Sequence, residues 1–467
     1  MDKFFHVTER GSTIRTEITA GLTTFMAMAY ILMVNPGMIS SVGTVSYGAI
    51  YIATAISAVV GTVLIGLLAN LPLAQASGMG LNAFFVYTVC FGFGLSYANA
   101  LVLVLCDGII FVLLTVTGLR KLIFDAIPQA VKTAISAGIG LFIAFIGMQN
   151  AGIVVNDEAT LVNLRSFNLL GGNVTWADLF PVLITILAVF AIAAMAHRKV
   201  RGAVLWGLLG AAVMYYAVGL LTVPGFYDAA VAPKLTSDFL GAFRDFGSQA
   251  FMKVFTEGFD FSAYIAAHGT VDFIIMFLTT MLAFCMVDMF DTLGTLFGAC
   301  SVGGLLTKEG DVPNMNRAML ADSVATCCGA MCGTSTVTTY VESSSGVAEG
   351  GRTGLTSMAT AFFFFIAMFL APVAQLVPSY ACAAALIYVG VLMMGNVKNI
   401  DWSDASAAVP AFLTMAFMPL TYNISYGIAF GLIGYVFTKL FSGKAKEINA
   451  GTWVIAILFT VMFFVSR

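Results

Sequence analysis

The chain has 467 residues, of which 60% are hydrophobic and only 10% are charged, and its formal net charge is −3. This composition excludes an ordinary soluble domain and is typical of a protein that crosses a membrane many times. The small net charge gives no reason to expect a nucleic-acid partner. The eight cysteines show no metal-binding or redox spacing, so neither a metal site nor a cofactor is expected.

Apolar runs long enough to span a bilayer recur along the chain in two sets. Spans of the first set are predicted at about residues 19–39, 48–69, 72–93, 98–119, 129–149, 178–196 and 203–222. Spans of the second set are predicted at about residues 272–298, 316–332, 334–351, 354–375, 378–396, 404–421 and 424–441. A Phe-rich stretch in the loop between the sets predicts a helix lying in the membrane interface. The last apolar run, 451–466, is read as a further span or an interfacial helix.

These runs predict an all-α polytopic membrane protein with fourteen transmembrane spans. Lysine and arginine concentrate in the loops on the side of the N-terminus, which predicts a cytoplasmic N-terminus. The two sets also share weak motifs in the same order, for example Trp176-Ala-Asp and Trp402-Ser-Asp. Because each set has seven spans, an odd number, the second set must be inverted. The sequence therefore predicts a seven-plus-seven inverted repeat with a substrate site near the midplane.

The most informative stretch is 333–354, which reads GTSTVTTYVESSSGVAEGGRTG between two apolar runs. Its β-branched first part predicts a short strand, and the serines that follow Glu342 predict the start of a helix. A break of this kind in the predicted span 10 persists only where it is buried or lines a cavity. The helix start also brings positive partial charge towards mid-membrane. We therefore expect Glu342, with its neighbours Val341 and Ser343, to bind the substrate.

The repeat predicts a matching break in span 3, where residues 71–85 read LPLAQASGMGLNAFF. Small residues fill this break, which is again expected to hold a short strand. Asn82 stands where the helix would resume and aligns with Glu342. Two half-helices that point at each other from opposite sides would bring Asn82 and Glu342 together.

Further acids lie inside apolar segments. Asp288 and Asp291, in MLAFCMVDMFDTLGTLFGA, share one helical face. A charge at mid-membrane costs at least about 2.5–3.5 kcal/mol, so both need a reason to be there. We interpret Asp288 as a substrate acceptor or proton-coupling group and Asp291 as a proton-coupling group. The alternative is that they only hydrogen-bond the broken spans. Asp107, in VLVLCDGIIF, is a secondary candidate whose role is equally open to either reading.

Three stretches together resemble a known family. DMFDTLGTL, the stretch 333–354 and the N-terminal TEITAGLTTFMAMAYILMVNP are similar to the AzgA-like purine permeases. These form a branch of the nucleobase–cation symporter-2 (nucleobase–ascorbate transporter) family, and the resemblance covers about residues 3–466. It implies a homodimer in the plasma or inner membrane and proton-coupled uptake of hypoxanthine, guanine or adenine. By this resemblance Asp288, Glu342 and Asn82 match the family's positions in spans 8, 10 and 3.

The resemblance also implies a core domain of spans 1–4 and 8–11 and a gate domain of spans 5–7 and 12–14. The expected segments are the cytoplasmic N-terminus 1–18, core 19–119 and 271–375, gate 129–222 and 378–441, the extracellular or periplasmic loop 223–270, and the C-terminal segment 442–467. In this interpretation the core domain carries the substrate across the membrane against the gate domain, like an elevator.

A purine also suits the site on chemical grounds. Its ring N–H and amino groups are donors in one plane, which a carboxylate can accept, and an asparagine can both donate and accept. The predicted function is secondary active import of purine bases with a proton, although a sodium ion is not excluded. A xanthine or uracil permease and an anion carrier of the same fold remain alternatives. An intramembrane enzyme is disfavoured because no nucleophile–base pair is present.

Overall fold

The protein is a mostly helical, multi-pass membrane protein. The computed structural model describes residues 2–118, 126–169, 174–226, 240–308 and 311–465. Within these residues, ten helices are long and apolar enough to cross a membrane. Helix length and composition thus give ten spans where the sequence predicted fourteen. The four missing from this count are spans 3 and 10, which are interrupted, span 9, which is rich in polar residues, and span 13, whose helix has 17 residues.

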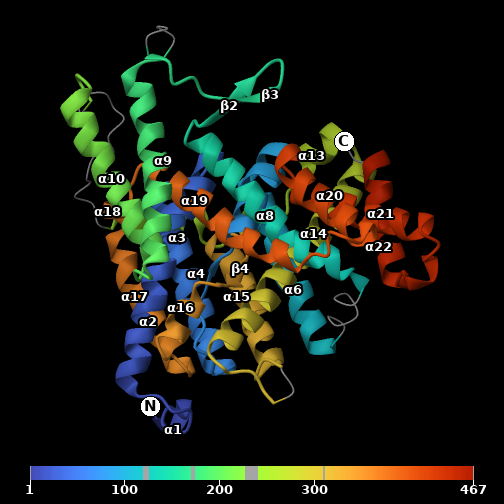
Figure 1. The fold of residues 1–467 in the computed structure, drawn as a ribbon, viewed down its shortest axis with the longest axis horizontal. Helices are drawn as coiled ribbons and strands as arrows, with labels where there is room; N and C mark the ends of the chain where they lie inside the picture. The colour runs from blue at the N-terminus through green and yellow to red at the C-terminus, as the bar shows by residue number, and fades with distance from the viewer. Residues whose placement is uncertain (1, 119–125, 170–173, 227–239, 309–310, 466–467) are drawn as a thin grey trace.

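The helices of the first half begin with a short N-terminal turn. They are α1 (Asp2–Phe5), α2 (Ile14–Met28), α3 (Ile31–Ile39), α4 (Tyr47–Leu68), α5 (Met79–Ala83), α6 (Tyr97–Thr117), α8 (Gln129–Asn150), α9 (Trp176–His197) and α10 (Ala203–Thr222). A π-helical segment, Phe84–Gly92, continues α5. The strand pair β2 (Val154–Asp157) and β3 (Leu161–Leu164) forms a hairpin at the end of the molecule opposite the N-terminus (Figure 1).

The second half follows the long loop. Its helices are α14 (Thr270–Val302), α15 (Met315–Cys332), α16 (Ser343–Ala348), α17 (Gly354–Ala367), α18 (Ala371–Ala374), α19 (Ser379–Met393), α20 (Ala405–Thr421), α21 (Ile424–Phe441) and α22 (Ala450–Val465). Two further short strands, β1 (Gln75–Ser77) and β4 (Val337–Thr339), come from opposite halves of the chain and lie near the middle of the molecule, where Figure 1 labels β4.

Polar side chains fix where several of these helices start. Ser96 and Asn99 form a reciprocal capping box at the start of α6. Thr175 and Asp178 form a second one at the start of α9. Each pair satisfies backbone N–H groups that have no partner inside the helix. The sequence thus sets these helix starts locally, whereas the positions of the helices depend on packing.

Packing divides the long helices into two groups. The first helix group is α2, α3, α4, α6, α14, α15, α16 and α17 together with α5, β1 and β4, and the second helix group is α8, α9, α10, α19, α20 and α21. In the first group, α4 and α17 cross very closely. A Cβ atom on Gly354 would lie 2.1 Å from the carbonyl oxygen of Gly66, so this crossing requires glycine.

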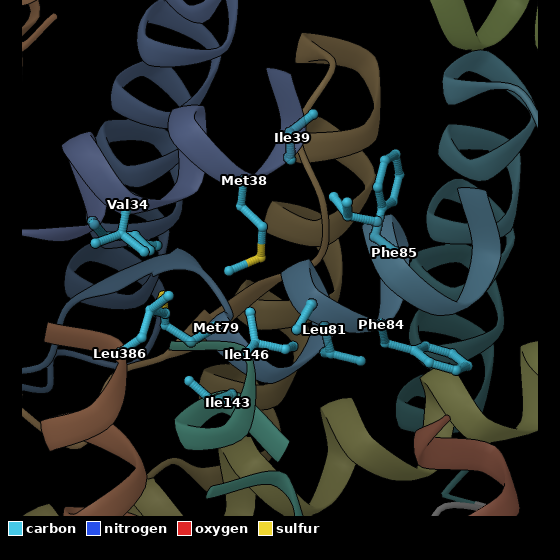
Figure 2. Close-up of a cluster of buried hydrophobic side chains, with 14 of the residues drawn as sticks. Val34, Met38, Ile39, Met79, Leu81, Phe84, Phe85, Ile143, Ile146 and Leu386 are labelled. Atoms are coloured by element: carbon cyan, nitrogen blue, oxygen red, sulfur yellow. The ribbon is translucent and has the colours of Figure 1, made fainter. Parts of the chain in front are cut away.

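Part of the contact between the two helix groups is apolar, although the Thr88 hydroxyl donates a 2.8 Å hydrogen bond to the carbonyl oxygen of Tyr422 and Arg201 pairs with Glu349 across the same boundary. Figure 2 shows Met38 of α3 and Met79 and Leu81 of α5 beside Ile143 of α8 and Leu386 of α19, all of them buried. A Cβ on Gly80 would lie 2.5 Å from Cγ2 of Ile139, which shows how closely α5 approaches α8. Side chains without hydrogen bonds therefore meet at this part of the boundary.

The loop between the halves differs from the sequence prediction of one interfacial helix. Its described part contains three short helices, α11 (Gly241–Asp245), α12 (Lys253–Thr256) and α13 (Ser262–His268), and residues 227–239 lie outside the described residues. α11 and α12 pack on α4 and α6, and Ala250 is fully buried. The Ser46 hydroxyl at the start of α4 donates a 2.8 Å hydrogen bond to Asp245, which ties this part of the loop to the first helix group. An interfacial position of the loop stays a prediction. The last helix, α22, packs against α21 and α14.

Candidate functional site

The candidate site is built on the β1–β4 pair. The strands are antiparallel, with Gln75 opposite Thr339, Ala76 opposite Thr338 and Ser77 opposite Val337, and all six residues are buried. Each strand leads into a helix, β1 into α5 and β4 into α16. Backbone groups inside a membrane must find partners, and here the two interrupted segments satisfy each other.

Glu342 lies where β4 leads into α16. Its Oε1 accepts a 2.7 Å hydrogen bond from the hydroxyl of Tyr30, which lies in the short break between α2 and α3. The Glu342 side chain is half-buried, and its neighbour Val341 is 49% exposed. Glu342 is therefore a partly exposed residue of the first helix group whose carboxylate is fixed on one oxygen.

Asp291 of α14 lies beside Glu342 and is also half-buried. Its Oδ2 accepts a 3.4 Å hydrogen bond from the Thr338 hydroxyl, and it interacts electrostatically with Glu342. Tyr340 interacts with both acids and donates a 2.5 Å hydrogen bond to the carbonyl oxygen of Ser77. Two partly accessible carboxylates and two tyrosines thus gather at one place.

Asn82 and Ser343 are placed differently from their predicted roles. Asn82 is fully buried, and its Oδ1 accepts a 2.7 Å hydrogen bond from the Ser77 hydroxyl. Ser343 is also fully buried, and its Oγ accepts a 3.0 Å hydrogen bond from the backbone N–H of Ala74. Neither side chain is bonded to Glu342. Ser77–Asn82 closes the turn from β1 into α5, and Ser343–Ala74 joins the two interrupted segments.

Asp288 lies one turn before Asp291 on α14 but is enclosed. It has no exposed surface, and the one hydrogen-bond donor beside it among the described residues is the Thr326 hydroxyl of α15. It interacts electrostatically with Asp322 of α15 and Asp107 of α6. The structure therefore places Asp291 next to Glu342 and encloses Asp288 with Asp322 and Asp107, while Asp291 also interacts electrostatically with Asp288 and Asp322.

Sequence reasoning missed Asp322 and Tyr30. Asp322 is fully buried and accepts hydrogen bonds from Nε2 of Gln75 (2.9 Å), Oγ1 of Thr292 (2.8 Å) and Oγ1 of Thr339 (3.1 Å). The sequence could have indicated Asp322, because it is an acid inside an apolar run, which is the criterion that identified Asp107. Tyr30 gave no such signal, since it stands in an unbroken apolar run and its partner is 312 positions away.

The site is chemically an array of acceptors. No described lysine or arginine donates a hydrogen bond to Glu342 or Asp291. In the described ranges of the chain, no group of three or more His, Cys, Asp or Glu side chains is arranged to hold a metal ion. An uncharged ligand with several N–H donors is the chemical match for two neighbouring carboxylates.

Comparison with known proteins places this geometry in context. Residues 15–430 match the model described as the Permease family. The chain is 40% identical to the guanine/hypoxanthine permease PbuG of Bacillus subtilis, over 99% of each protein. It is 36% identical to the adenine permease AdeP of Escherichia coli, over 98% of this chain and 95% of that protein. The transmembrane domain of a cyanobacterium bicarbonate transporter, BicA, has a TM-score of 0.58 at 15% identity, with 95% and 97% of the chains covered. At this identity the last likeness shows the fold alone.

Proposed function

The chain belongs to the Permease family, and on this premise we propose that it imports purine nucleobases, namely hypoxanthine, guanine or adenine, by symport with a proton. The observation that carries the proposal is the half-buried carboxylate of Glu342, fixed by Tyr30 beside the half-buried carboxylate of Asp291. The relatives named guanine/hypoxanthine and adenine permeases support the substrate class.

In the proposed complex, Glu342 and Asp291 accept the donors of the base. A neutral purine presents ring N–H and exocyclic amino groups in one plane, which a carboxylate can accept in bidentate fashion. The exposed side chain of Val341 offers an apolar contact for the ring face. Ser343 and Asn82 hold the two strand–helix turns in place, so they shape the site from behind.

Asp288 carries the coupling proton in this proposal, because it is fully enclosed and lies among other acids, which disfavours a charge there. Asp291 takes part in both binding and coupling through its interaction with Glu342. An anion such as bicarbonate suits the site poorly, since two carboxylates would repel it. The likeness to BicA therefore supports a common fold and not a common substrate.

The transport movement we propose is an elevator. The first helix group corresponds to the core segments 19–119 and 271–375, and the second helix group to the gate segments 129–222 and 378–441. The apolar part of the contact in Figure 2 supports sliding, and the contacts that would have to break include the Thr88–Tyr422 hydrogen bond and the Arg201–Glu349 ion pair. A fourteen-span inverted repeat, a homodimer in the plasma or inner membrane and a cytoplasmic N-terminus complete the proposal.

The test is competition for uptake of labelled hypoxanthine by cells that lack their own purine permeases. We expect guanine and adenine to compete, uracil not to compete, and a protonophore to abolish accumulation. Glu342→Gln should reduce uptake at least about tenfold, because a hydrogen bond to a charged group contributes about 1.5–3 kcal/mol. The exposed Glu158, in the β2–β3 hairpin, gives the matched control Glu158→Gln, which should behave like the unaltered protein. Full uptake by Glu342→Gln would refute the proposed site.

A further inference from the structure

Asp107 lies in the middle of α6, outside the proposed binding site. This side chain has no exposed surface, and neither of its oxygens has a hydrogen-bond partner among the described residues. A buried polar group without a partner is costly, and a charged one is far more so. A structural aspartate would be expected to use its acceptors, as Asp322 does with three donors.

The surroundings of Asp107 are tightly closed. The next residue, Gly108, packs against α15 so closely that a Cβ there would lie 2.6 Å from Sγ of Cys327 and 3.2 Å from the carbonyl oxygen of Ser323. Ser323 directly follows Asp322, so Asp107 and Asp322 lie at neighbouring positions of two helices in contact. Asp107 interacts electrostatically with Asp322 and with Asp288 of α14.

The titratable groups around Asp107 are all acids or thiols. They are Asp288 and Cys285 of α14, Asp322 and Cys327 of α15, and the adjacent Cys106 of α6. No described lysine, arginine or histidine interacts with it. Thr326, a hydroxyl on the same face of α15, is already used, because it donates a 3.1 Å hydrogen bond to the carbonyl oxygen of Val337.

Asp107, which has no hydrogen-bond partner among the described residues, and Asp288, which has only the Thr326 hydroxyl beside it, therefore differ from Asp322, which three donors hold as an acceptor. A proton on either of these two acids removes one negative charge from the enclosed space. The protonated acid then has an O–H group that can donate a hydrogen bond to an oxygen of the other acid. Buried ionisable groups of this kind in membrane proteins mark proton pathways more often than packing.

We propose that Asp107 is a second proton-binding residue of the transport cycle, which exchanges one proton with Asp288. In this step the O–H bond of the Asp288 carboxyl group breaks and an O–H bond forms on Asp107, while the negative charge passes from Asp107 to Asp288. The proton comes from and returns to water, so no other reactant is needed. The inference rests on the proposed proton–purine symport and adds a residue to it.

The test compares two activities of the purified protein in sodium-free liposomes. Accumulation of labelled hypoxanthine driven by a pH gradient requires net proton transfer, whereas exchange of internal for external hypoxanthine at equal pH does not. We expect the exchange rate of Asp107→Asn to stay within about twofold of that of the unaltered protein. Its gradient-driven accumulation should fall at least about tenfold. Thr115→Val, on the same helix, is the matched control. It removes a buried hydroxyl that also has no hydrogen-bond partner among the described residues, and it should keep both activities.

Asp107→Glu covers the case in which Asp107→Asn does not fold. It keeps the acid but moves its oxygens, so we expect accumulation to persist with a shifted pH profile. The inference is overturned by normal accumulation in Asp107→Asn, by loss of both activities in folded Asp107→Asn, or by an unchanged pH profile in Asp107→Glu. The symport proposal itself fails separately, if the unaltered protein shows no exchange or no response to the pH gradient.

Discussion

The hydroxyl of Tyr30 offers the sharpest test of how the site holds its carboxylate. Tyr30→Phe removes one oxygen atom and leaves the ring in its buried position. Glu342 then loses the hydrogen bond that the Tyr30 hydroxyl donates to its Oε1. Because Glu342 sits at the turn between β4 and α16, its backbone remains held by the strand pair and only the carboxylate becomes free to rotate.

The magnitude follows from this geometry. A hydrogen bond to a charged group contributes about 1.5–3 kcal/mol in total. The hydroxyl is present both before and after a base binds, so only the part that orients the carboxylate is lost from binding. If about 1 kcal/mol of it is lost, affinity falls about fivefold, since 1.4 kcal/mol corresponds to a factor of ten. The maximal rate should stay within about twofold, because Tyr30 is not proposed to exchange a proton.

The assay is the concentration dependence of hypoxanthine uptake together with equilibrium binding to the purified protein. Tyr51→Phe is the matched control, because Tyr51 is also buried and donates one 2.7 Å hydrogen bond, to the carbonyl oxygen of Ala367. It should lower stability by about 1 kcal/mol and leave KM unchanged. An unchanged KM and Kd in Tyr30→Phe, or an equal rise in Tyr51→Phe, would refute the positioning role.

Three further predictions concern parts of the molecule away from the site. Glu17→Gln should lower the unfolding temperature in detergent without changing KM. The reason is that the buried Glu17 carboxylate accepts hydrogen bonds from backbone N–H groups in the first turn of α17 and just before it, and an unchanged melting curve would contradict this. Gly354→Ala should cost about 1–3 kcal/mol of stability, since its Cβ would lie 2.1 Å from a backbone oxygen of α4, whereas Gly210→Ala, which meets nothing within 4 Å, should be neutral. In the β2–β3 hairpin, the backbone N–H of Thr160 and other hairpin donors hold the pKa of Asp157 at about 2, below the ordinary value of 3.8. This stabilisation is complete above about pH 4 and is lost as the pH falls towards 2, so pepsin should cut the hairpin faster across that window in the unaltered protein, and Asp157→Asn should remove the pH dependence.

The sequence was most informative where a local pattern conflicted with a membrane span. The polar, β-branched residues before Glu342 have no reason to lie in an apolar helix, and they form β4 and the turn into α16. The apolar runs likewise identified the chain as multi-pass. Both features depend on residues that are close together in the sequence, so composition and spacing were enough to find them.

Features that depend on distant partners could not be predicted in the same way. Asn82 was expected to reach the substrate, but Ser77, five positions earlier, satisfies its Oδ1. The role of Tyr30 depends on a carboxylate in the other half of the chain. The Phe-rich loop was expected to form one helix, yet its described part contains several short helices, of which α11 and α12 pack on α4 and α6. In each case the type of residue was clear, and its partner was set by the tertiary fold.

The alternation of side chains along β4 explains why the acids fall into two sets. Successive residues of a strand point to opposite faces. Thr338 donates to Asp291, on the side of Glu342, whereas the next residue, Thr339, donates to Asp322, on the side of Asp288 and Asp107. A slip of one residue in the pairing with β1 would exchange the two threonines and bring each to the wrong acid. In the proposed mechanism, the three-residue register with β1 therefore separates the two partly exposed acids that bind the substrate from the enclosed acids that carry the proton.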